Sequence, residues 1–180
     1  MSKELKKKII EERYNATAYL YDDRYTNIQE TKYKAVLEDR LTSQIVEPII
    51  DVGGGTGLLI DFLSSKFKDI WCIDLSFQML KKGKSKRPEG NFICADSDSL
   101  PLRSHSVHTV TSFTMLQNLP YPSRTIKEFN RIIQRGGMVF LTFLTKKLTK
   151  DEIVQQVQKY FKIEKAWNLP VEDVAIIAKK

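Results

Sequence analysis

Apolar and polar positions follow two different spacings along this chain. In residues 3–43 the apolar positions recur at helical spacing, as at Tyr33, Val36, Leu37 and Leu41, which predicts two helices around a tyrosine-rich middle. From residue 45 onward, short apolar runs alternate with amphipathic segments. The apolar runs predict strands at 48–52, 69–74, 91–95, 107–113, 138–144, 162–167 and 173–178, and the segments between them predict helices at 57–67, 76–86, 123–134 and 150–160.

Several of the predicted helices carry end signals. Ser76, Ser123 and Thr149 are expected to be N-caps, because a side-chain oxygen at this position accepts a hydrogen bond from the first free N–H groups of a helix. The pair Gly136-Gly137 is expected to end the helix over 123–134.

The order of the elements predicts the architecture. Strands that alternate with helices favour a doubly wound α/β fold, in which helices cover both faces of a mostly parallel sheet. The last two strands are joined by Asn168, Leu169 and Pro170, a link too short for a parallel crossover. We therefore expect these two strands to form an antiparallel pair.

The first strand leads into the most distinctive segment, IIDVGGGTGLL at residues 49–59. Its glycines let the backbone approach a ligand closely and place helix N–H groups beside that ligand; they are Gly53, Gly54, Gly55 and Gly57. The dinucleotide pattern G-x-G-x-x-G fails, because the third glycine position, counted from Gly53 and Gly55, is Leu58. The spacing is instead D-x-G-x-G-x-G, beginning at Asp51.

This motif resembles motif I of the class I S-adenosylmethionine-dependent methyltransferases. The similarity to the ubiquinone- and menaquinone-biosynthesis type, the "type 11" methyltransferase domain, covers about residues 45–178. The resemblance implies a Rossmann-like methyltransferase fold with seven strands in the order 3-2-1-4-5-7-6, the last of them antiparallel, and S-adenosyl-L-methionine as the cofactor. Residues 45–180 are then the cofactor-binding domain and residues 1–44 a helical N-terminal lid segment, together one structural domain.

The resemblance also assigns roles at the strand ends, where open parallel sheets bind ligands. Asp74 ends the second strand, and its carboxylate can accept hydrogen bonds from a ribose diol, a role that a dehydrogenase would share. Asp96 is expected to bond the adenine amino group, with the backbone of Ser97 facing the ring and Phe113 against the cofactor. The full set of cofactor-binding candidates is Asp51, Gly53, Gly54, Gly55, Gly57, Asp74, Leu75, Asp96, Ser97 and Phe113.

The acceptor side is less defined. Residues 21–25 resemble a Y-D-x-x-Y segment that folds over the cofactor in related methyltransferases, and Tyr21 and Asn118 are the candidates for positioning the acceptor. Helix packing with surface phenols is the alternative for the tyrosines. No catalytic dyad stands out, and methyl transfer depends mainly on alignment of the reacting groups.

The composition restricts the class of protein but does not indicate a function. With 180 residues, 42% hydrophobic and 28% charged, the chain is typical of one globular domain, and no apolar stretch approaches the ~20 residues that cross a membrane. Cys72 and Cys94 have neither metal-ligand spacing nor a disulfide framework. We therefore expect no metal, no membrane contact and a cytoplasmic location.

The positive charge of the chain indicates a possible class of binding partner. The formal net charge is +7, and residues 81–87 contain five cations, Lys81, Lys82, Lys84, Lys86 and Arg87. This basic cluster can bind RNA, because phosphate contacts dominate nucleic-acid affinity, or it can be a Lys-rich solvated surface. Both interpretations stay open.

The sequence therefore predicts a methyltransferase that converts S-adenosylmethionine to S-adenosylhomocysteine. Only the first 45 or so residues remain to cover the pocket, and a shallow site flanked by lysines favours RNA as the acceptor. A homodimer partner or an activator subunit that completes the site leaves a small-molecule acceptor as the alternative. A non-catalytic RNA-binding subunit is a further alternative, whereas Leu58 and the terminal strand pair disfavour a nicotinamide oxidoreductase.

Overall fold

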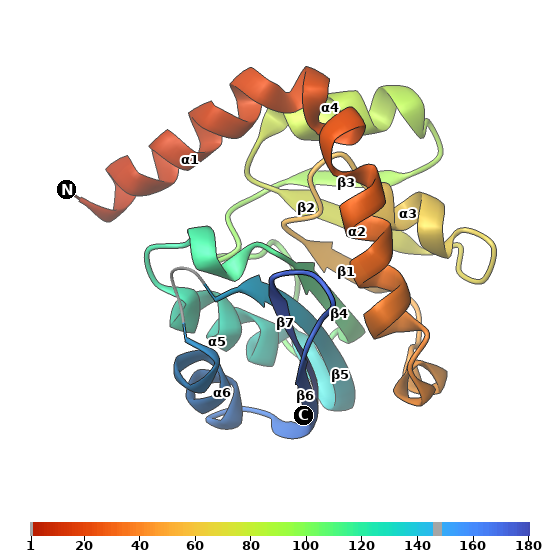
Figure 1. Cartoon of the computed structure of the whole chain (residues 1–180), viewed down its shortest axis with the longest axis vertical. Coiled ribbons are helices and arrows are strands. Elements are labelled where there is room, and N and C mark those ends of the chain that lie inside the picture. Colours follow the sequence, from red (N-terminus) through yellow and green to blue (C-terminus); the bar gives the residue numbers. More distant parts are fainter. Residues whose placement is uncertain (1, 146–148) are drawn as a thin grey trace.

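A seven-stranded sheet forms the centre of the molecule, with helices on both sides (Figure 1). The computed structural model describes residues 2–145 and 149–180. Its helices are α1 (Lys3–Thr17), α2 (Tyr21–Leu37), α3 (Leu58–Leu63), α4 (Phe77–Lys86), α5 (Pro122–Ile132) and α6 (Lys150–Gln158). Its strands are β1 (Ile49–Val52), β2 (Ile70–Asp74), β3 (Asn91–Cys94), β4 (Val107–Phe113), β5 (Ile133–Leu144), β6 (Lys162–Asn168) and β7 (Asp173–Lys179).

The strands lie in the order β3-β2-β1-β4-β5-β7-β6. The pairs among β1 to β5 are parallel, whereas β7 runs antiparallel to both β5 and β6. The predicted fold class, strand order and antiparallel last strand are confirmed. Because the strand order reverses at β1 and β4, their carboxyl ends meet at the switch point where such sheets bind ligands.

Two buried clusters join the sheet to its helices. On one face, α5 and α6 contribute Ile126, Phe129 and Ile153. On the other face, α2 contributes Tyr33 and α3 contributes Leu59. Helices thus cover both faces of the sheet, as the alternation of elements predicts.

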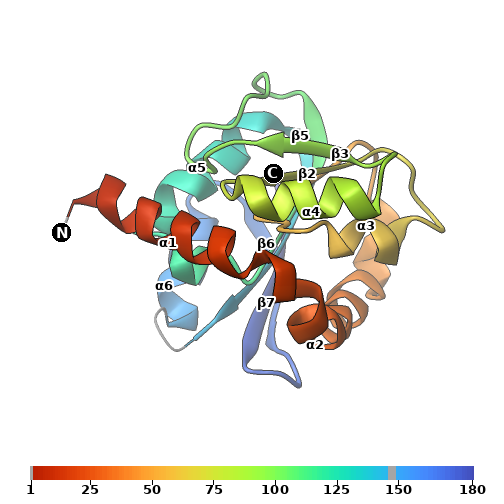
Figure 2. The same cartoon turned by 90° about the horizontal axis from the view of Figure 1, so that it is seen from above.

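The two N-terminal helices occupy different positions. α2 packs against α3, whereas α1 runs past α4, and the N-terminal end of α1 projects beyond the sheet (Figure 2). Near the other end of α1, Asn15 Oδ1 accepts hydrogen bonds from Ser76 Oγ at 2.7 Å and from Gln78 N at 3.1 Å. α1 is therefore attached to the start of α4 and crosses the carboxyl edge of the sheet.

Two of the three predicted helix caps are present. The side chains of Ser76 and Thr149 cap α4 and α6, the latter in a capping box. Ser123 is not a cap, because α5 begins at Pro122, a residue suited to the first turn since it has no N–H to satisfy. α3 ends at Leu63 and is shorter than the predicted helix over 57–67.

The boundary between α5 and β5 also differs from the prediction. α5 ends at Ile132, so Gly136 and Gly137 lie inside β5 instead of ending the helix. There β5 forms a bulge in its pairing with β4. Gly136 has a φ of 82°, and a Cβ on Gly137 would lie 2.5 Å from the backbone oxygen of His108. The two glycines thus permit the bulge.

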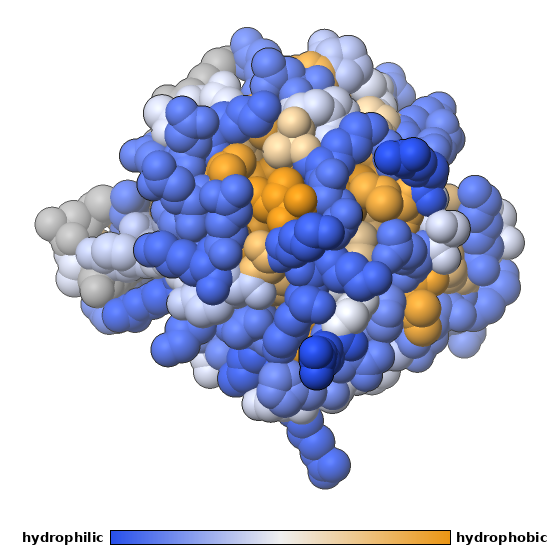
Figure 3. Space-filling view, turned by 90° about the horizontal axis from the view of Figure 1, so that it is seen from below, coloured by the Kyte–Doolittle hydropathy of each residue, from blue (hydrophilic) through white to orange (hydrophobic). Residues whose placement is uncertain are grey.

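Hydrophilic residues predominate on the face shown in Figure 3, where hydrophobic residues appear in several small patches. Within the described parts of the chain, no helix combines the length and apolarity required to span a bilayer.

Candidate functional site

A cleft opens at the carboxyl ends of β1, β2 and β4, the edge at which sheets of this strand order bind ligands. We call it the glycine-loop cleft. Most of the residues singled out from the sequence line it: Tyr21, Gly53, Gly55, Asp74, Leu75, Asp96, Ser97, Phe113 and Asn118. Asp51, Gly54 and Gly57 do not.

The glycine loop follows β1 and turns its backbone toward the cleft. Gly53 and Gly55 have φ values of 76° and 60°, which residues with a Cβ rarely adopt. Gly53 N donates a hydrogen bond to Ile73 O at 2.7 Å, so the loop is fastened to the end of β2. A Cβ on Gly55 would lie 2.9 Å from Cε of Met79. The two glycines therefore contribute only backbone to this wall of the cleft, and the side chain of Met79 packs closely against it.

Asp74 holds the loop in place from the end of β2. Its Oδ2 accepts a hydrogen bond from Gly55 N at 2.9 Å, and its Oδ1 accepts one from Ser76 N at 2.8 Å. Burial raises the pKa of Asp74, and these backbone hydrogen bonds oppose that effect. A carboxylate oxygen has room for more than one donor, so Asp74 can also accept hydrogen bonds from a ligand in the cleft.

Asp51, Gly54 and Gly57 support the loop from behind. Asp51 is 3% exposed and accepts a hydrogen bond from Thr111 Oγ1 at 2.8 Å. A Cβ on Gly54 would lie 2.4 Å from Asp51 Oδ2. Gly57 precedes α3 with a φ of 79°, and a Cβ there would lie 2.9 Å from the ring of Phe92. These residues shape the loop without facing the cleft.

At the other end of the cleft, Asp96 is paired with a lysine that the sequence analysis did not single out. Lys7, on α1, lies 2.6 and 2.7 Å from the two oxygens of Asp96 and 2.6 Å from Asp98. Burial disfavours the charge on Lys7, but the hydrogen bonds and the charges of both carboxylates outweigh it and raise the pKa of Lys7. α1 is thus fixed over the cleft by one cation between two anions.

Tyrosines from the N-terminal helices form the roof. The ring centroids of Tyr14 and Tyr21 are 6.4 Å apart, and those of Tyr21 and Tyr25 are 4.8 Å apart. Burial raises the pKa of Tyr21. Asn118 Nδ2 donates a hydrogen bond to Tyr14 Oη at 3.2 Å, so the predicted acceptor-positioning residues Tyr21 and Asn118 both contact Tyr14.

A second, larger cleft of about 1520 Å³ adjoins the first. It shares four lining residues with the glycine-loop cleft: Tyr14, Tyr21, Thr114 and Asn118. In its wall, Lys32 of α2 lies 3.0 Å from Asp173 Oδ1 and donates a hydrogen bond to Thr114 Oγ1 at 2.7 Å. Thr114 Oγ1 in turn donates to Asp173 Oδ2 at 2.9 Å. The side chains of Lys32 and Asp173 are only 4% and 1% exposed, so this is a buried ion pair.

Thr114 connects the two clefts. It follows β4 with a φ of 56°, an uncommon conformation for a β-branched residue and one that is typically found at functional sites. No sequence motif marks the contact of Thr114 with Lys32 and Asp173, because the three residues come from the N-terminal helices, the middle of the sheet and its last strand.

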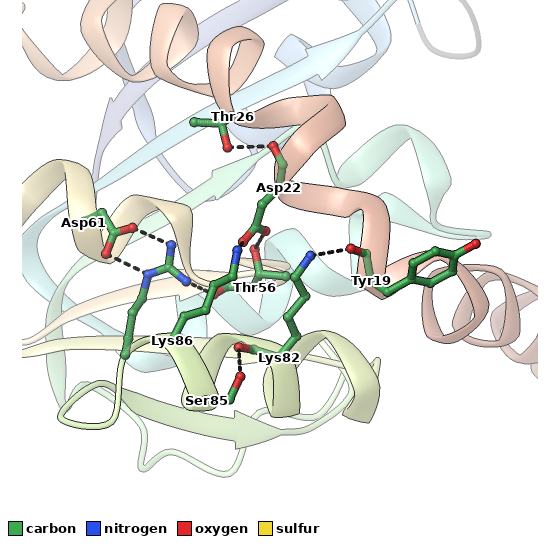
Figure 4. Close-up of polar contacts among 9 residues, drawn as sticks. Tyr19, Asp22, Thr26, Thr56, Asp61, Lys82, Ser85 and Lys86 are labelled. Atoms are coloured by element: carbon green, nitrogen blue, oxygen red, sulfur yellow. Dashed lines mark hydrogen bonds and ion pairs between the residues drawn. The ribbon is translucent and has the colours of Figure 1, made fainter.

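Four of the five cations at residues 81–87 have hydrogen bonds or ion pairs within the chain, and Figure 4 shows those of Lys82 and Lys86. Lys86 Nζ lies 2.6 Å from Asp22 Oδ2, and Thr56 Oγ1 donates to Asp22 Oδ1 at 2.6 Å. Lys82 donates to the backbone oxygen of Tyr19 at 2.8 Å. Arg87 forms an ion pair with Asp61 and donates a hydrogen bond to the backbone oxygen of Thr56 at 2.9 Å. Lys84 donates hydrogen bonds to the backbone oxygens of Pro88 and Gly90 at 2.6 and 3.0 Å. The cluster therefore attaches α2 and the glycine loop to α4.

Other chemistry at the site is limited. Cys72 is buried and Cys94 is exposed, and neither forms a disulfide. Among residues 2–145 and 149–180, no group of three or more His, Cys, Asp and Glu side chains is placed to hold a metal ion.

Comparisons with curated proteins identify relatives of this chain. A demethylmenaquinone methyltransferase of Paenarthrobacter aurescens is 25% identical over 142 residues, which cover 73% of this chain and 56% of that protein. A malonyl-[acyl-carrier protein] O-methyltransferase of Hamiltonella defensa is 31% identical over 111 residues, covering 62% and 43%. The chain spans about half the length of the curated relatives it matches.

Solved structures share the fold at low identity. Magnesium protoporphyrin IX methyltransferase from Synechocystis, solved with bound S-adenosylmethionine, has a TM-score of 0.77 at 16% identity, and the match covers 97% of both chains. The methyltransferase complexed with the Trm112 activator of Haloferax volcanii has a TM-score of 0.73 at 16% identity, covering 92% and 96%. The family model described as "Methyltransferase domain" matches residues 50–141, and this chain belongs to that family.

Proposed function

We propose that this protein transfers a methyl group from S-adenosylmethionine to a small molecule. The observation that carries the proposal is the adjacency of two clefts, one built on the glycine loop and the other opening from it at Thr114. A donor in the first cleft and an acceptor in the second would meet at their shared wall. Such alignment of two reactants is the main contribution that an enzyme makes to a displacement reaction.

The residues of the glycine-loop cleft fit the proposed cofactor. Gly53 and Gly55 would present backbone to the methionine part, and Asp74 retains acceptor capacity for the ribose hydroxyls. Asp96 would receive the adenine amino group beside Lys7, which neutralises the carboxylate. When bound, the cofactor supplies a methyl group on a sulfonium.

A small-molecule acceptor replaces RNA in this proposal for two reasons. The relatives are named for demethylmenaquinone and for a malonyl group on a carrier protein, and neither name contains a nucleic acid. Four of the five cations of the basic cluster, which favoured RNA in the sequence, have bonds to Asp22, Asp61 and backbone oxygens. An activator subunit is retained as a proposed partner, because one neighbour is complexed with an activator.

Two measurements test this function. Calorimetry should detect binding of S-adenosylhomocysteine, and incubation of host extract with methyl-labelled S-adenosylmethionine should place the label in the small-molecule fraction. Label recovered in RNA would contradict the acceptor assignment. Absence of binding to either form of the cofactor would contradict the methyltransferase assignment itself.

The ribose assignment is tested at Asp74. We expect Asp74→Ala to weaken S-adenosylhomocysteine binding at least about tenfold, since the cleft loses a hydrogen-bond acceptor and the N–H groups of Gly55 and Ser76 lose their partner. Asp23→Ala, on the exposed side of α2, is the matched control and should bind as the wild type does. Circular dichroism melting establishes that both variants are folded. Unchanged affinity of a folded Asp74→Ala variant would contradict the assignment.

A further inference from the structure

One face of α2 lines the second cleft. Its lining residues recur three and four positions apart, which places them in a single stripe along the helix. They are Tyr21, Arg24, Tyr25, Ile28, Gln29 and Lys32. The end of α1 adds Arg13, Tyr14 and Thr17 to the same lining. The side chains of this wall of the cleft therefore come from the two N-terminal helices.

The stripe on α2 contains two large apolar side chains that the protein leaves uncovered. Tyr25 and Ile28 are 43% and 41% exposed. Apolar side chains that stay exposed inside a concave site are typical of a surface that contacts a ligand. This part of the cleft therefore suits an apolar group.

The charges of the lining leave an excess of one cation. Three cations, Arg13, Arg24 and Lys32, line the cleft together with two anions, Glu172 and Asp173. Lys32 and Asp173 neutralise each other in their buried ion pair at 3.0 Å. Glu172 is engaged in an interaction of its own. The positive charge of the cleft thus comes from the two arginines.

The two arginines lack the acidic neighbours that would neutralise them. The residues three and four positions away are Ile9, Ile10, Ala16 and Thr17 for Arg13, and Leu20, Tyr21, Asn27 and Ile28 for Arg24. Both side chains are exposed, and no carboxylate of residues 2–145 or 149–180 forms an ion pair with either of them. The guanidinium carbon of Arg13 lies 5.0 Å from the centroid of the Tyr14 ring, inside the lining of the cleft. Both cations are therefore available to an anionic ligand.

The kind of anion follows from the kind and number of these charges. A guanidinium binds a carboxylate through two parallel hydrogen bonds, a geometry that a lysine ammonium does not offer. An excess of one positive charge matches a carboxylate better than a phosphate monoester, which carries about −1.5 to −2 at neutral pH. Arg13 and Arg24 line the second cleft alone, whereas Thr114 lines both clefts. A carboxylate bound by the arginines would therefore lie away from the wall that the two clefts share.

We propose that the methyl acceptor is a small amphiphilic acid, whose carboxylate is bound by Arg13 and Arg24 and whose apolar part lies against Tyr25 and Ile28. The carboxylate serves for recognition, and the atom that receives the methyl group lies toward Thr114. This inference rests on the proposed function, because the second cleft takes an acceptor only if the glycine-loop cleft takes the methyl donor.

The test is an NMR titration of the protein loaded with S-adenosylhomocysteine. The probes are 3-phenylpropanoate, its neutral analogue 3-phenylpropanamide, and 2-phenylethyl phosphate as the dianion. The acid and the amide have nearly the same shape and differ in charge. We expect the acid to bind about tenfold more tightly than the amide, since two exposed ion pairs contribute about threefold each. The phosphate should bind no more tightly than the acid.

Charge variants assign this preference to the two arginines. Arg13→Gln and Arg24→Gln should each lower the preference for the acid about threefold, and the double variant should abolish it. Arg24→Lys should restore part of the preference, because it retains the charge without the planar fork. Arg135→Gln is the matched control, since Arg135 is also exposed but lies on β5, outside the lining of the second cleft.

The outcomes separate this inference from the proposed function. Equal binding of acid and amide, binding of no probe, or a preference that survives in the folded double variant would overturn the carboxylate assignment. Tighter binding of the phosphate would also overturn it. A loss of S-adenosylhomocysteine affinity in the arginine variants, absent in Arg135→Gln, would mean that the arginines bind the carboxylate of the cofactor instead. Failure of the wild type to bind S-adenosylhomocysteine would overturn the proposed function itself.

Discussion

At the scale of single residues, the buried carboxyl group of Asp51, behind the glycine loop, makes the stability of the fold depend on pH. Burial raises its pKa from 3.8 to about 7, the hydrogen bond from Thr111 opposes this, and the charge of Asp74 adds to it. Since the folded-state pKa lies above the unfolded value, the native state holds the proton more tightly. The stabilisation from this group is complete below the unfolded pKa and is lost as pH rises through about 7.

We expect Asp51→Asn to remove this pH dependence. Asn retains an oxygen for Thr111 Oγ1 but does not titrate. Urea unfolding at pH 5 and pH 8 should show that the wild type loses about 2–3 kcal/mol more stability over this interval than the variant does. Identical pH dependence of the two proteins would show that Asp51 does not titrate in this range.

A second prediction for single residues concerns the contribution of the buried Lys32–Asp173 ion pair to stability. Lys32→Met should destabilise the protein by about 3–5 kcal/mol in urea unfolding, because it leaves the Asp173 carboxylate buried without its cation. The double variant Lys32→Met/Asp173→Leu should recover most of that loss, since both charges are then absent. A double variant as unstable as the single one would mean that packing, not charge, dominates at this position.

At the scale of the elements, Lys7 supplies the charged attachment of α1. Lys7→Met should increase amide hydrogen exchange in α1 about tenfold, because the helix loses its charged hydrogen bonds to Asp96 and Asp98. Lys8→Met is the control, since Lys8 is 70% exposed and its pairing with Glu12 spans 4.0 Å. Equal exchange in the two variants would show that Lys7 does not hold α1 in place.

The elements themselves were predictable because their signals are local. The apolar runs predicted the strands, and the glycine spacing predicted the loop after β1. The strand order followed from the resemblance to a known family. The short link between β6 and β7 predicted that these two strands are antiparallel. The start of β5 was missed because Gly136-Gly137 is equally suited to a helix end and to a strand bulge. The side-chain partners could not be read from the sequence: Lys7 meets Asp96, and Lys32 meets Asp173, only after the sheet is assembled.

At the scale of the whole molecule, α2 is part of the buried core. Its residues Tyr33, Val36 and Leu37 are 4%, 0% and 5% exposed and belong to the same cluster as Ile49 and Phe140 of the sheet. α1, in contrast, is attached largely through polar contacts at Lys7, Tyr14 and Asn15. We therefore expect removal of α1 and removal of α2 to have different effects on the stability of the fold.

Two truncations test this difference. The fragment 18–180 should retain a cooperative thermal transition with a lowered midpoint, because the core stays covered. The fragment 45–180 should lose the transition, because the face beneath α2 is exposed to water. A cooperative transition in fragment 45–180 would show that the sheet and its remaining helices fold without α2.

The contact of Asp22 with both Lys86 and Thr56 has a consequence for how the molecule responds to its medium. One carboxylate joins the start of α2, the end of α4 and the glycine loop, so a ligand that orders the loop also favours the docked position of α2. Coupling of this kind is reciprocal: a ligand that favours the docked position of α2 is itself bound more weakly when that docking is weakened. Since added salt screens a half-exposed pair, ionic strength becomes an effector of the cleft, acting from outside it.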